Sequence, residues 1–176
     1  MVKLDETRAF LALKIAVLTV SDTRTLEDDQ SGSIMVSLLE EAGHKAVERA
    51  IAPDDIAQIR AKVAGWIANP DIDVVLTTGG TGFTGRDVTP EALMPLFDKH
   101  IDGFSVIFHM ISYEKIRTST LQSRACAGVA NGTYIFCLPG SPNACRDGWN
   151  EILKWQLDNR HLPCNFVEIM PRIMER

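Results

Sequence analysis

Three short apolar runs in the first half of the chain have the pattern of buried β-strands. They cover residues 15–20, 47–52 and 73–78, and the second is the weakest of the three. The other two consist mainly of β-branched and aliphatic side chains, which favours strands that are buried on both faces of a parallel sheet.

Two segments with helical spacing separate these strands. In the first, apolar residues recur every three or four positions over 34–42, and we predict that Ser31 caps this helix and Gly43 ends it. In the second, which begins at Asp54, they recur over 56–67. This alternation predicts a parallel sheet with right-handed crossovers and with ligands at the carboxyl ends of its strands.

The second half predicts two more helices, at 89–100 and 103–116, and then a β-hairpin. The hairpin strands are 124–130 and 133–138, and Asn131-Gly132 between them is a strong turn signal. A last helix follows the hairpin. Its N-cap is Ser141, with Pro142 at the first helical position.

Together these elements predict one α/β domain over residues 1–176. We expect three layers, with helices on both faces of a mostly parallel sheet and a small antiparallel β-ribbon. No internal repeat or linker is evident, and at 176 residues folding buries roughly 70% of the chain's surface.

Charge and composition exclude several classes of partner. The net charge is −5 and no basic cluster is present, which argues against nucleic acid. The apolar run at 10–20 follows Asp5 and Glu6 and contains Lys14, so it does not read as a signal sequence or a membrane span. We expect a soluble, cytoplasmic protein without membrane contact.

The four cysteines have no CxxC spacing, and the histidines form no metal-binding motif. We expect reduced, structural cysteines that behave as small buried hydrophobes. They are Cys126, Cys137, Cys145 and Cys164.

The segment 77–92, TTGGTGFTGRDVTPEA, has the pattern of a phosphate site. Its glycines follow a buried strand and remove side chains that would keep a phosphate from the backbone N–H groups. Thr89 can cap a helix that starts with Pro90, so a positive helix end would face the site. Asp87 precedes that helix, where it could hold Mg²⁺. The segment is neither a Walker A sequence nor a dinucleotide fingerprint.

Simpler interpretations of the same residues remain open. Asp54 is suited to be a helix cap, and Arg86 either neutralises phosphate or covers the surface. Ser21, Ser31 and Ser141 are all suited to turns or caps, and no histidine completes a Ser-His-Asp triad.

Taken whole, the segment resembles the MoaB/MogA family of molybdenum cofactor biosynthesis proteins, which is related to the G domains of gephyrin and of a plant cofactor protein. The resemblance runs over nearly all the chain. It includes Ser21-Asp22, Ser31-Gly32, Pro53-Asp54, the TGGTG turn and Leu138-Pro139-Gly140-Ser141-Pro142.

The resemblance implies an enzyme that binds molybdopterin and MgATP, transfers AMP to the terminal phosphate of the pterin and releases pyrophosphate. It makes Asp54 and Asp87 the catalytic, magnesium-binding pair. The residues that it assigns to substrate binding are Ser21, Asp22, Ser31, Gly32, Gly79, Gly80, Thr81, Gly82, Arg86, Ser123, Gly140, Ser141 and Pro142.

Other stretches resemble the MoaB branch more than the MogA branch, namely residues 40–44, 118–124 and 162–166. Some MoaB proteins lack the Arg-Asp-Val-Thr pattern, which this chain keeps at 86–89, so we favour activity. The alternatives are a non-catalytic pterin- or nucleotide-binding paralogue with a scaffold role and a CinA-like nucleotide-processing domain. Molybdenum and tungsten pathways both remain open.

The resemblance also implies a homo-oligomer, a trimer or a dimer of trimers, and we favour the hexamer. Independently, apolar residues surround most of the helix at 103–116, so it is buried either in its own domain or against another subunit. We expect an exposed face of Phe104, Ile107, Phe108 and Ile111. Other molybdenum cofactor biosynthesis proteins are further candidate partners.

Overall fold

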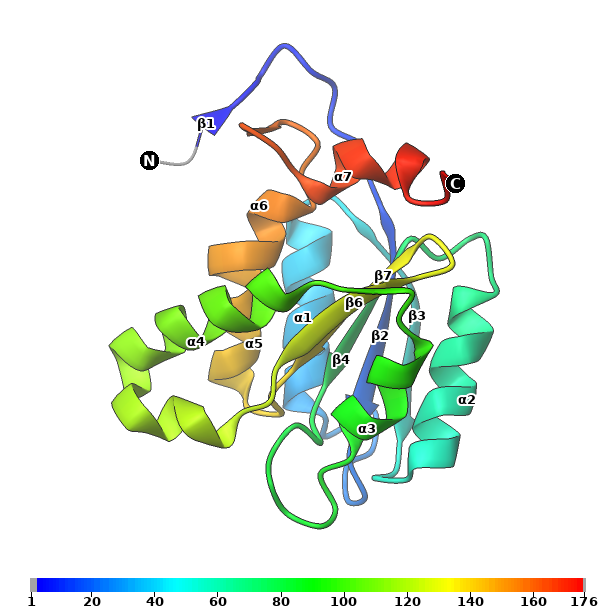
Figure 1. The fold of residues 1–176 in the computed structure, drawn as a ribbon, viewed down its shortest axis with the longest axis vertical. Coiled ribbons are helices and arrows are strands. Elements are labelled where there is room, and N and C mark those ends of the chain that lie inside the picture. Colours follow the sequence, from blue (N-terminus) through cyan, green and yellow to red (C-terminus); the bar gives the residue numbers. More distant parts are fainter. Residues whose placement is uncertain (1–2, 176) are drawn as a thin grey trace.

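The computed structural model describes residues 3–175, which form three layers around a six-stranded mixed sheet (Figure 1). The strand order is β3-β2-β4-β7-β6-β5, and the first four strands are parallel. This confirms the predicted fold class. The strands are β2 (Lys14–Val20), β3 (Lys45–Ala52), β4 (Val74–Thr78), β5 (Lys99–His100), β6 (Cys126–Ala130) and β7 (Thr133–Leu138).

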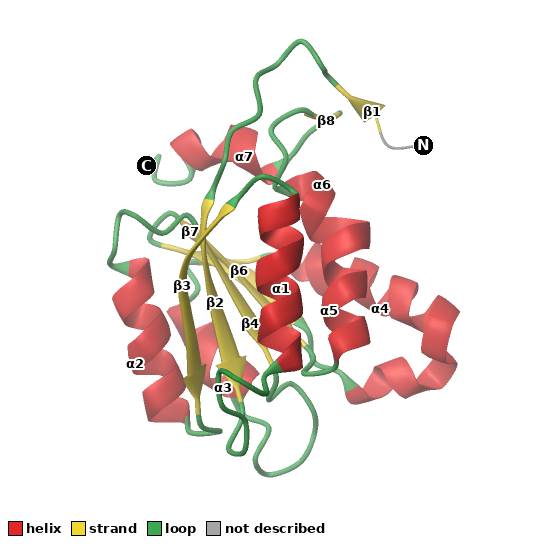
Figure 2. Cartoon of the chain, turned by 180° about the vertical axis from the view of Figure 1, so that it is seen from behind, coloured by secondary structure: helices red, strands yellow, loops and turns green. Residues whose placement is uncertain are grey.

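The two faces of the sheet are covered by different helices (Figure 2). One face packs against α1 (Gln30–Glu41), α4 (Asp102–Ile116) and α5 (Pro142–Gly148), and the other packs against α2 (Ile56–Ile67) and α3 (Thr89–Leu93). Successive residues of β2 enter opposite cores, because side chains alternate along a strand. The continuous apolar runs are therefore explained by burial on both faces.

The parallel strands end at one edge of the sheet. Thr19 of β2 is paired with Thr78 of β4, and Thr78 is paired in turn with Leu138 of β7. The loops after these strands therefore lie together, as the alternation of strands and helices predicts. In Figure 1 the long loop between β4 and α3 extends below the sheet at this edge.

The predicted helix at 89–100 is wrong beyond Leu93. α3 ends there, a 3₁₀ turn (η1, Met94–Leu96) follows, and β5 then pairs with β6. Pro95 cannot donate a helical hydrogen bond, and Phe97 has an extended backbone that lets its ring pack against Gly128. Pairing with the sheet edge outweighs the helical pattern of this segment.

After α5 the last predicted helix continues through a π-helical turn (η3, Trp149–Leu153) and α6 (Lys154–Gln156). The elements that follow it were not predicted from the sequence pattern. β8 (His161–Leu162) pairs with β1 (Lys3–Leu4) in a second, two-stranded sheet. α7 (Phe166–Ile169) and a 3₁₀ turn (η4, Met170–Arg172) close the chain at the end of the molecule opposite the β4–α3 loop (Figure 1).

Two further expectations are tested by the described residues. The four cysteines are free thiols; Cys137 and Cys145 are buried and Cys126 is half-buried, but Cys164 is exposed and so is not a core residue. Within residues 3–175 the helices are all too short or too polar to cross a bilayer.

Candidate active site

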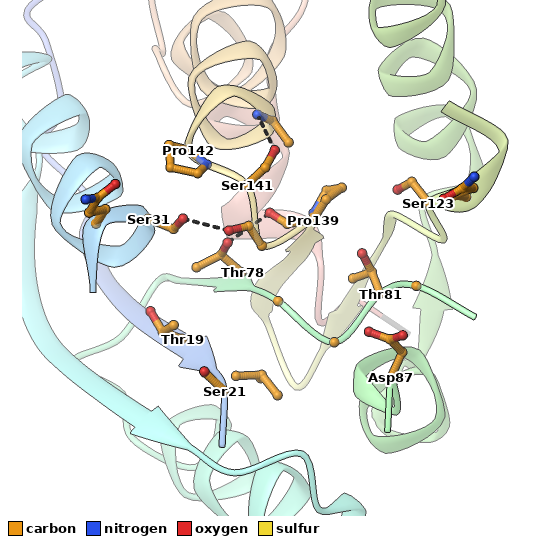
Figure 3. Close-up of a pocket in the computed structure, with 18 of the residues that line it drawn as sticks. Thr19, Ser21, Ser31, Thr78, Thr81, Asp87, Ser123, Pro139, Ser141 and Pro142 are labelled. Atoms are coloured by element: carbon orange, nitrogen blue, oxygen red, sulfur yellow. Dashed lines mark hydrogen bonds between the residues drawn. The ribbon is translucent and has the colours of Figure 1, made fainter. Parts of the chain in front are cut away.

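A cavity of about 530 Å³ lies at the edge where the parallel strands end (Figure 3). Its wall is built by the loops after β2, β3, β4 and β7 and by the start of α1. Most of the predicted site residues line it: Ser21, Ser31, Asp54, Gly79, Gly80, Thr81, Gly82, Asp87, Ser123, Gly140, Ser141 and Pro142.

The glycine turn after β4 has a backbone that favours glycine. Gly79 and Gly80 have φ angles of 101° and 63°, which side chains rarely tolerate. A Cβ on Gly79 would collide with the carbonyl oxygen of Val20, and one on Gly80 would collide with the hydroxyl of Thr89. The glycines are thus required by close approach of the protein's own strands and helices, a reason that the sequence pattern alone did not give.

Thr89 has a different role from the predicted helix cap. The residue before it, Val88, occupies the N-cap position of α3 and makes no side-chain capping bond. The Thr89 hydroxyl donates to the Gly79 carbonyl at 2.8 Å, and the Thr89 N–H donates to the Gly80 carbonyl at 2.9 Å. Thr89 therefore holds the glycine turn in place through hydrogen bonds to two of its carbonyl groups. Because α3 has only five residues, its dipole adds little positive potential at the cavity.

Asp87 lies in the loop between β4 and α3, against Gly82. Its Oδ2 atom would be 2.7 Å from a Cβ on Gly82, and it accepts hydrogen bonds from the Thr84 N–H (2.8 Å) and the Thr84 hydroxyl (2.7 Å). Partial burial works to raise the pKa of Asp87, but these hydrogen bonds outweigh it and the pKa lies below its usual value. Asp87 is therefore an anion at neutral pH.

Asp54 faces the same turn from the loop after β3. Its Oδ1 atom would lie 3.1 Å from a Cβ on Gly80. Burial, and after it the negative charge of Asp87, raise the pKa of Asp54. The helix cap that the sequence assigned to Asp54 belongs to its neighbour: Asp55 caps α2 by accepting from the Gln58 N–H at 2.8 Å. Asp54 is thus free of a capping role.

The two carboxylates fit a divalent cation that arrives with a phosphate ligand. Within residues 3–175 no set of three or more histidine, cysteine, aspartate or glutamate side chains gathers into a complete metal cage. Mg²⁺ is usually held by one or two carboxylates together with phosphate oxygens and water. Asp54 and Asp87 supply that number of protein ligands, and a cation between them would relieve their repulsion.

The loop after β7 forms the opposite wall. Ser141 caps α5 as predicted, accepting from the Ala144 N–H at 3.1 Å. Ser31 is not a cap: it lies inside α1, and its hydroxyl donates to the Gly140 carbonyl at 2.8 Å (Figure 3). A Cβ on Gly140 would stand 3.2 Å from the Cα atom of Gly79, so the two glycine-containing loops touch.

The N-cap of α1 is Asp29, a buried residue that the sequence pattern missed. Its carboxylate accepts from the Gly32 N–H (2.9 Å), the Thr19 hydroxyl (2.7 Å) and the Arg49 guanidinium (3.0 Å). This network connects β2, β3 and α1 next to the cavity, which Thr19 and Asp29 also line.

Three predicted residues do not line the cavity. Asp22 accepts from the Asp54 N–H at 3.1 Å and pairs with the exposed guanidinium of Arg86. Gly32 lies within α1, where a Cβ would collide with the carboxylate of Asp29. These residues support the loops behind the cavity wall.

A second wall was not predicted at all, apart from Ser123. It is formed by the later turns of α4 and by the 3₁₀ helix η2 (Arg117–Gln122). Among its polar side chains, the Thr120 hydroxyl is buried and has no hydrogen-bond partner in the part of the chain that the structure describes. Arg24, from the loop after β2, also lines the cavity. The missed lining residues of the second wall are Phe108, Ser112, Ile116, Ser119, Thr120 and Gln122.

Comparison with known proteins supplies the context for this cavity. The family described as "Probable molybdopterin binding domain" matches residues 16–159. Molybdenum cofactor biosynthesis protein B of Escherichia coli K12 is 54% identical over 157 residues, which cover 89% of this chain and 92% of that protein.

Solved structures agree with the sequence comparison. A crystal structure of molybdenum cofactor biosynthesis protein B superposes with a TM-score of 0.86 and 38% identity, over 96% of this chain and 100% of that chain. The tungsten cofactor synthesizing protein MoaB from Pyrococcus furiosus has a TM-score of 0.73 and 37% identity, over 81% of this chain and 91% of that chain.

Proposed function

The chain belongs to the molybdopterin-binding domain family that includes molybdenum cofactor biosynthesis protein B, and on this basis we propose that it acts in molybdenum or tungsten cofactor biosynthesis. Its proposed reaction is the transfer of AMP from MgATP to the terminal phosphate of molybdopterin. An oxygen of the pterin phosphate attacks the α-phosphorus of ATP, the bond to the β-phosphate breaks, and pyrophosphate leaves.

The observation that supports this reaction best is the pair Asp54 and Asp87, which lie beside one glycine turn. Attack of a phosphate monoester on an α-phosphate brings two anions together, so catalysis depends on positioning and on charge neutralisation. In the proposal both carboxylates hold Mg²⁺, whose positive charge offsets this repulsion.

The remaining cavity residues have groups suited to the two substrates. Hydroxyls of Ser21, Ser141 and Ser123 can donate to phosphate oxygens, as can backbone N–H groups of the glycine turn. Arg24 is a cation from the loop after β2 and would add positive charge near the triphosphate. Gly32, Asp22 and Arg86 contribute by supporting these loops.

The test is an assay with purified protein, molybdopterin, Mg²⁺ and ATP labelled on its α-phosphate. We expect the label to appear on the pterin as pyrophosphate is released in equal amount. Binding of both ligands without transfer would identify a non-catalytic, scaffolding paralogue. Nucleotide cleavage that does not require the pterin would favour a CinA-like activity.

The proposal also includes a homo-oligomer, with a hexamer as the favoured form. α4 has an outward apolar face: Val106 is 58% exposed and Met110 65%, and Leu121 of η2 beside them is 68% exposed. The residues expected there were partly wrong, because Phe104 and Phe108 are buried in the domain's own core. One face of α4 therefore packs in the domain's own core, and in the proposal a second copy of the chain covers the opposite, exposed face.

We propose that the protein acts in the cytoplasm, because the proposed reaction consumes ATP. Other proteins of cofactor biosynthesis would be its partners, since they supply molybdopterin or take its adenylylated product.

A further inference from the structure

We propose that Arg124 is a positioning residue that holds the loop carrying Asp87 in its working place. The inference rests on the proposed function, because it gives Asp87 the task of binding metal and phosphate. It adds a residue outside the predicted site: Arg124 follows Ser123 in the chain but does not line the main cavity.

Arg124 bonds to both ends of the loop between Gly82 and Asp87. Its Nε atom donates to the Gly82 carbonyl at 2.8 Å, and its Nη2 atom donates to the Asp87 carbonyl at 2.8 Å. Its backbone N–H donates to the Thr81 carbonyl at 2.9 Å. A guanidinium presents its donors in a rigid planar fork, so these bonds fix the spacing of the two loop ends.

The loop needs such a clamp because its own contacts are mostly local. Phe83, Thr84, Gly85 and Arg86 are exposed, and the Thr84–Asp87 hydrogen bonds shape only the turn itself. Apart from the surface pair of Arg86 with Asp22, the bonds from Arg124 are what attach this turn to the body of the protein in the described structure. Exposed backbone with few outside contacts opens readily.

Glu91 of α3 holds the guanidinium from the other side. It pairs with the Nη1 atom of Arg124, and the hydrogen bond from Arg124 is the main cause that lowers the pKa of Glu91. This ion pair uses a third nitrogen of the guanidinium, and because the Glu91 side chain is 46% exposed we expect it to add little to the two carbonyl hydrogen bonds. The Arg124 side chain is only 27% exposed, so water competes weakly for these carbonyls.

The position of Arg124 links the loop to the second cavity wall. Ser123, the preceding residue, lines the cavity, and its carbonyl oxygen is 3.0 Å from Nε2 of His109 on α4. The same short segment therefore contacts α4 on one side and the Asp87 loop on the other. Movement of Arg124 would displace Asp87 relative to both walls.

The experiment compares Arg124→Gln and Arg124→Lys with the control Glu91→Gln. The control removes the ion pair but leaves both carbonyl hydrogen bonds. The first readout is hydrogen exchange of residues 82–88 without substrate, and the second is Mn²⁺ binding in the presence of ATP, followed by electron paramagnetic resonance.

We expect both Arg124 variants to exchange about tenfold faster over residues 82–88, because neither side chain has the rigid planar fork whose separate Nε and Nη2 atoms reach the Gly82 and Asp87 carbonyls. Mn²⁺ affinity should fall about tenfold, and kcat for AMP transfer should fall more than the KM for molybdopterin changes. Glu91→Gln should stay within about threefold of the wild type in each readout.

Folded Arg124→Lys protein with wild-type exchange over 82–88 and wild-type Mn²⁺ affinity would overturn the inference. Equal effects of Glu91→Gln and Arg124→Gln would also overturn it, since the ion pair would then be the relevant contact. If the wild-type protein fails to transfer AMP, the proposed function falls, but exchange and Mn²⁺ binding still decide whether Arg124 holds the loop.

Discussion

The negative charge of Asp87 raises the pKa of Asp54 across the glycine turn, although the two residues come from different loops. The charge of Asp87 adds to burial in raising the pKa of Asp54, whereas the pKa of Asp87 is lowered because hydrogen bonds from Thr84 outweigh its burial. Two acids with displaced pKa values in one cleft are characteristic of functional sites. A cation bound between them would favour the ionised form of both.

Asp87→Asn should abolish most AMP transfer and leave the fold intact. The change removes one charge with almost no change in volume, and we expect a loss of about a hundredfold or more, equivalent to about 3 kcal/mol of transition-state stabilisation. The rate of AMP transfer and the melting temperature should both be measured. A correctly folded variant with normal turnover would refute the role given to Asp87.

Asp54→Asn should reduce activity without a loss of stability, because Asp55 and not Asp54 caps α2. The matched control is Asp55→Ala, which should cost about 1 kcal/mol of unfolding free energy through the lost cap while leaving most activity. Urea unfolding and the transfer assay separate the two effects. The opposite pattern, a stable but inactive Asp55→Ala protein, would exchange the roles of these neighbours.

The pKa of the Asp54 carboxyl should fall in the Asp87→Asn variant. The substitution removes the neighbouring negative charge but leaves the burial of Asp54. Carbon-13 NMR titration of the carboxyl carbon measures the change directly. An unaltered Asp54 pKa would mean that burial alone sets it.

The raised pKa of Asp54 also predicts how stability depends on pH. A group whose pKa is higher in the folded protein contributes stability below its unfolded pKa, and that contribution is lost as pH rises through the folded pKa. Asp54→Asn should therefore gain stability relative to the wild type between acid and neutral pH. A constant difference over this range would show that Asp54 is not perturbed by folding.

Gly80→Ala should destabilise the fold and should also weaken any phosphate binding. The sequence pattern suggested that a side chain here would fill ligand space, but the Cβ would collide with Thr89 at a φ of 63°. We expect a loss of about 1–3 kcal/mol in urea unfolding. The control is Gly85→Ala in the same loop: its Cβ would meet no atom within 4 Å, so the change should stay within about 0.5 kcal/mol.

The strands and the general place of the site could be predicted because burial leaves a clear sequence pattern. The runs that became β2, β4 and β7 are apolar on both faces, and parallel strands bring their carboxyl ends to one edge. That rule placed the ends of the predicted strands, with Asp54 and the glycine turn, at one edge, and the family resemblance added Asp87 as the partner of Asp54. The hairpin of β6 and β7 followed from Asn131-Gly132.

The details of the site depended on contacts that sequence spacing does not encode. Asp54 and Asp55 are equally good caps by residue type, and only the structure shows that it is Asp55 whose side chain accepts from the Gln58 N–H. Ser112 and Thr120 look like ordinary solvent-facing residues in the sequence, but α4 and η2 turn them toward the cavity. Arg124 gave no signal either, because its partners are backbone carbonyls of a distant loop.

Light scattering at micromolar concentration should give a mass that is a multiple of 19.5 kDa, with six copies as the expected number. A large exposed apolar face is usually covered by a partner. Met110→Glu places a charge in the middle of the outward face of α4, so it should shift the protein toward smaller species without unfolding it. Leu11→Glu is the matched control, because Leu11 is 54% exposed but lies near the N-terminus, outside that face. A wild-type protein with the mass of one chain would remove the oligomer from the proposal, and equal dissociation by both variants would place the interface elsewhere than on α4.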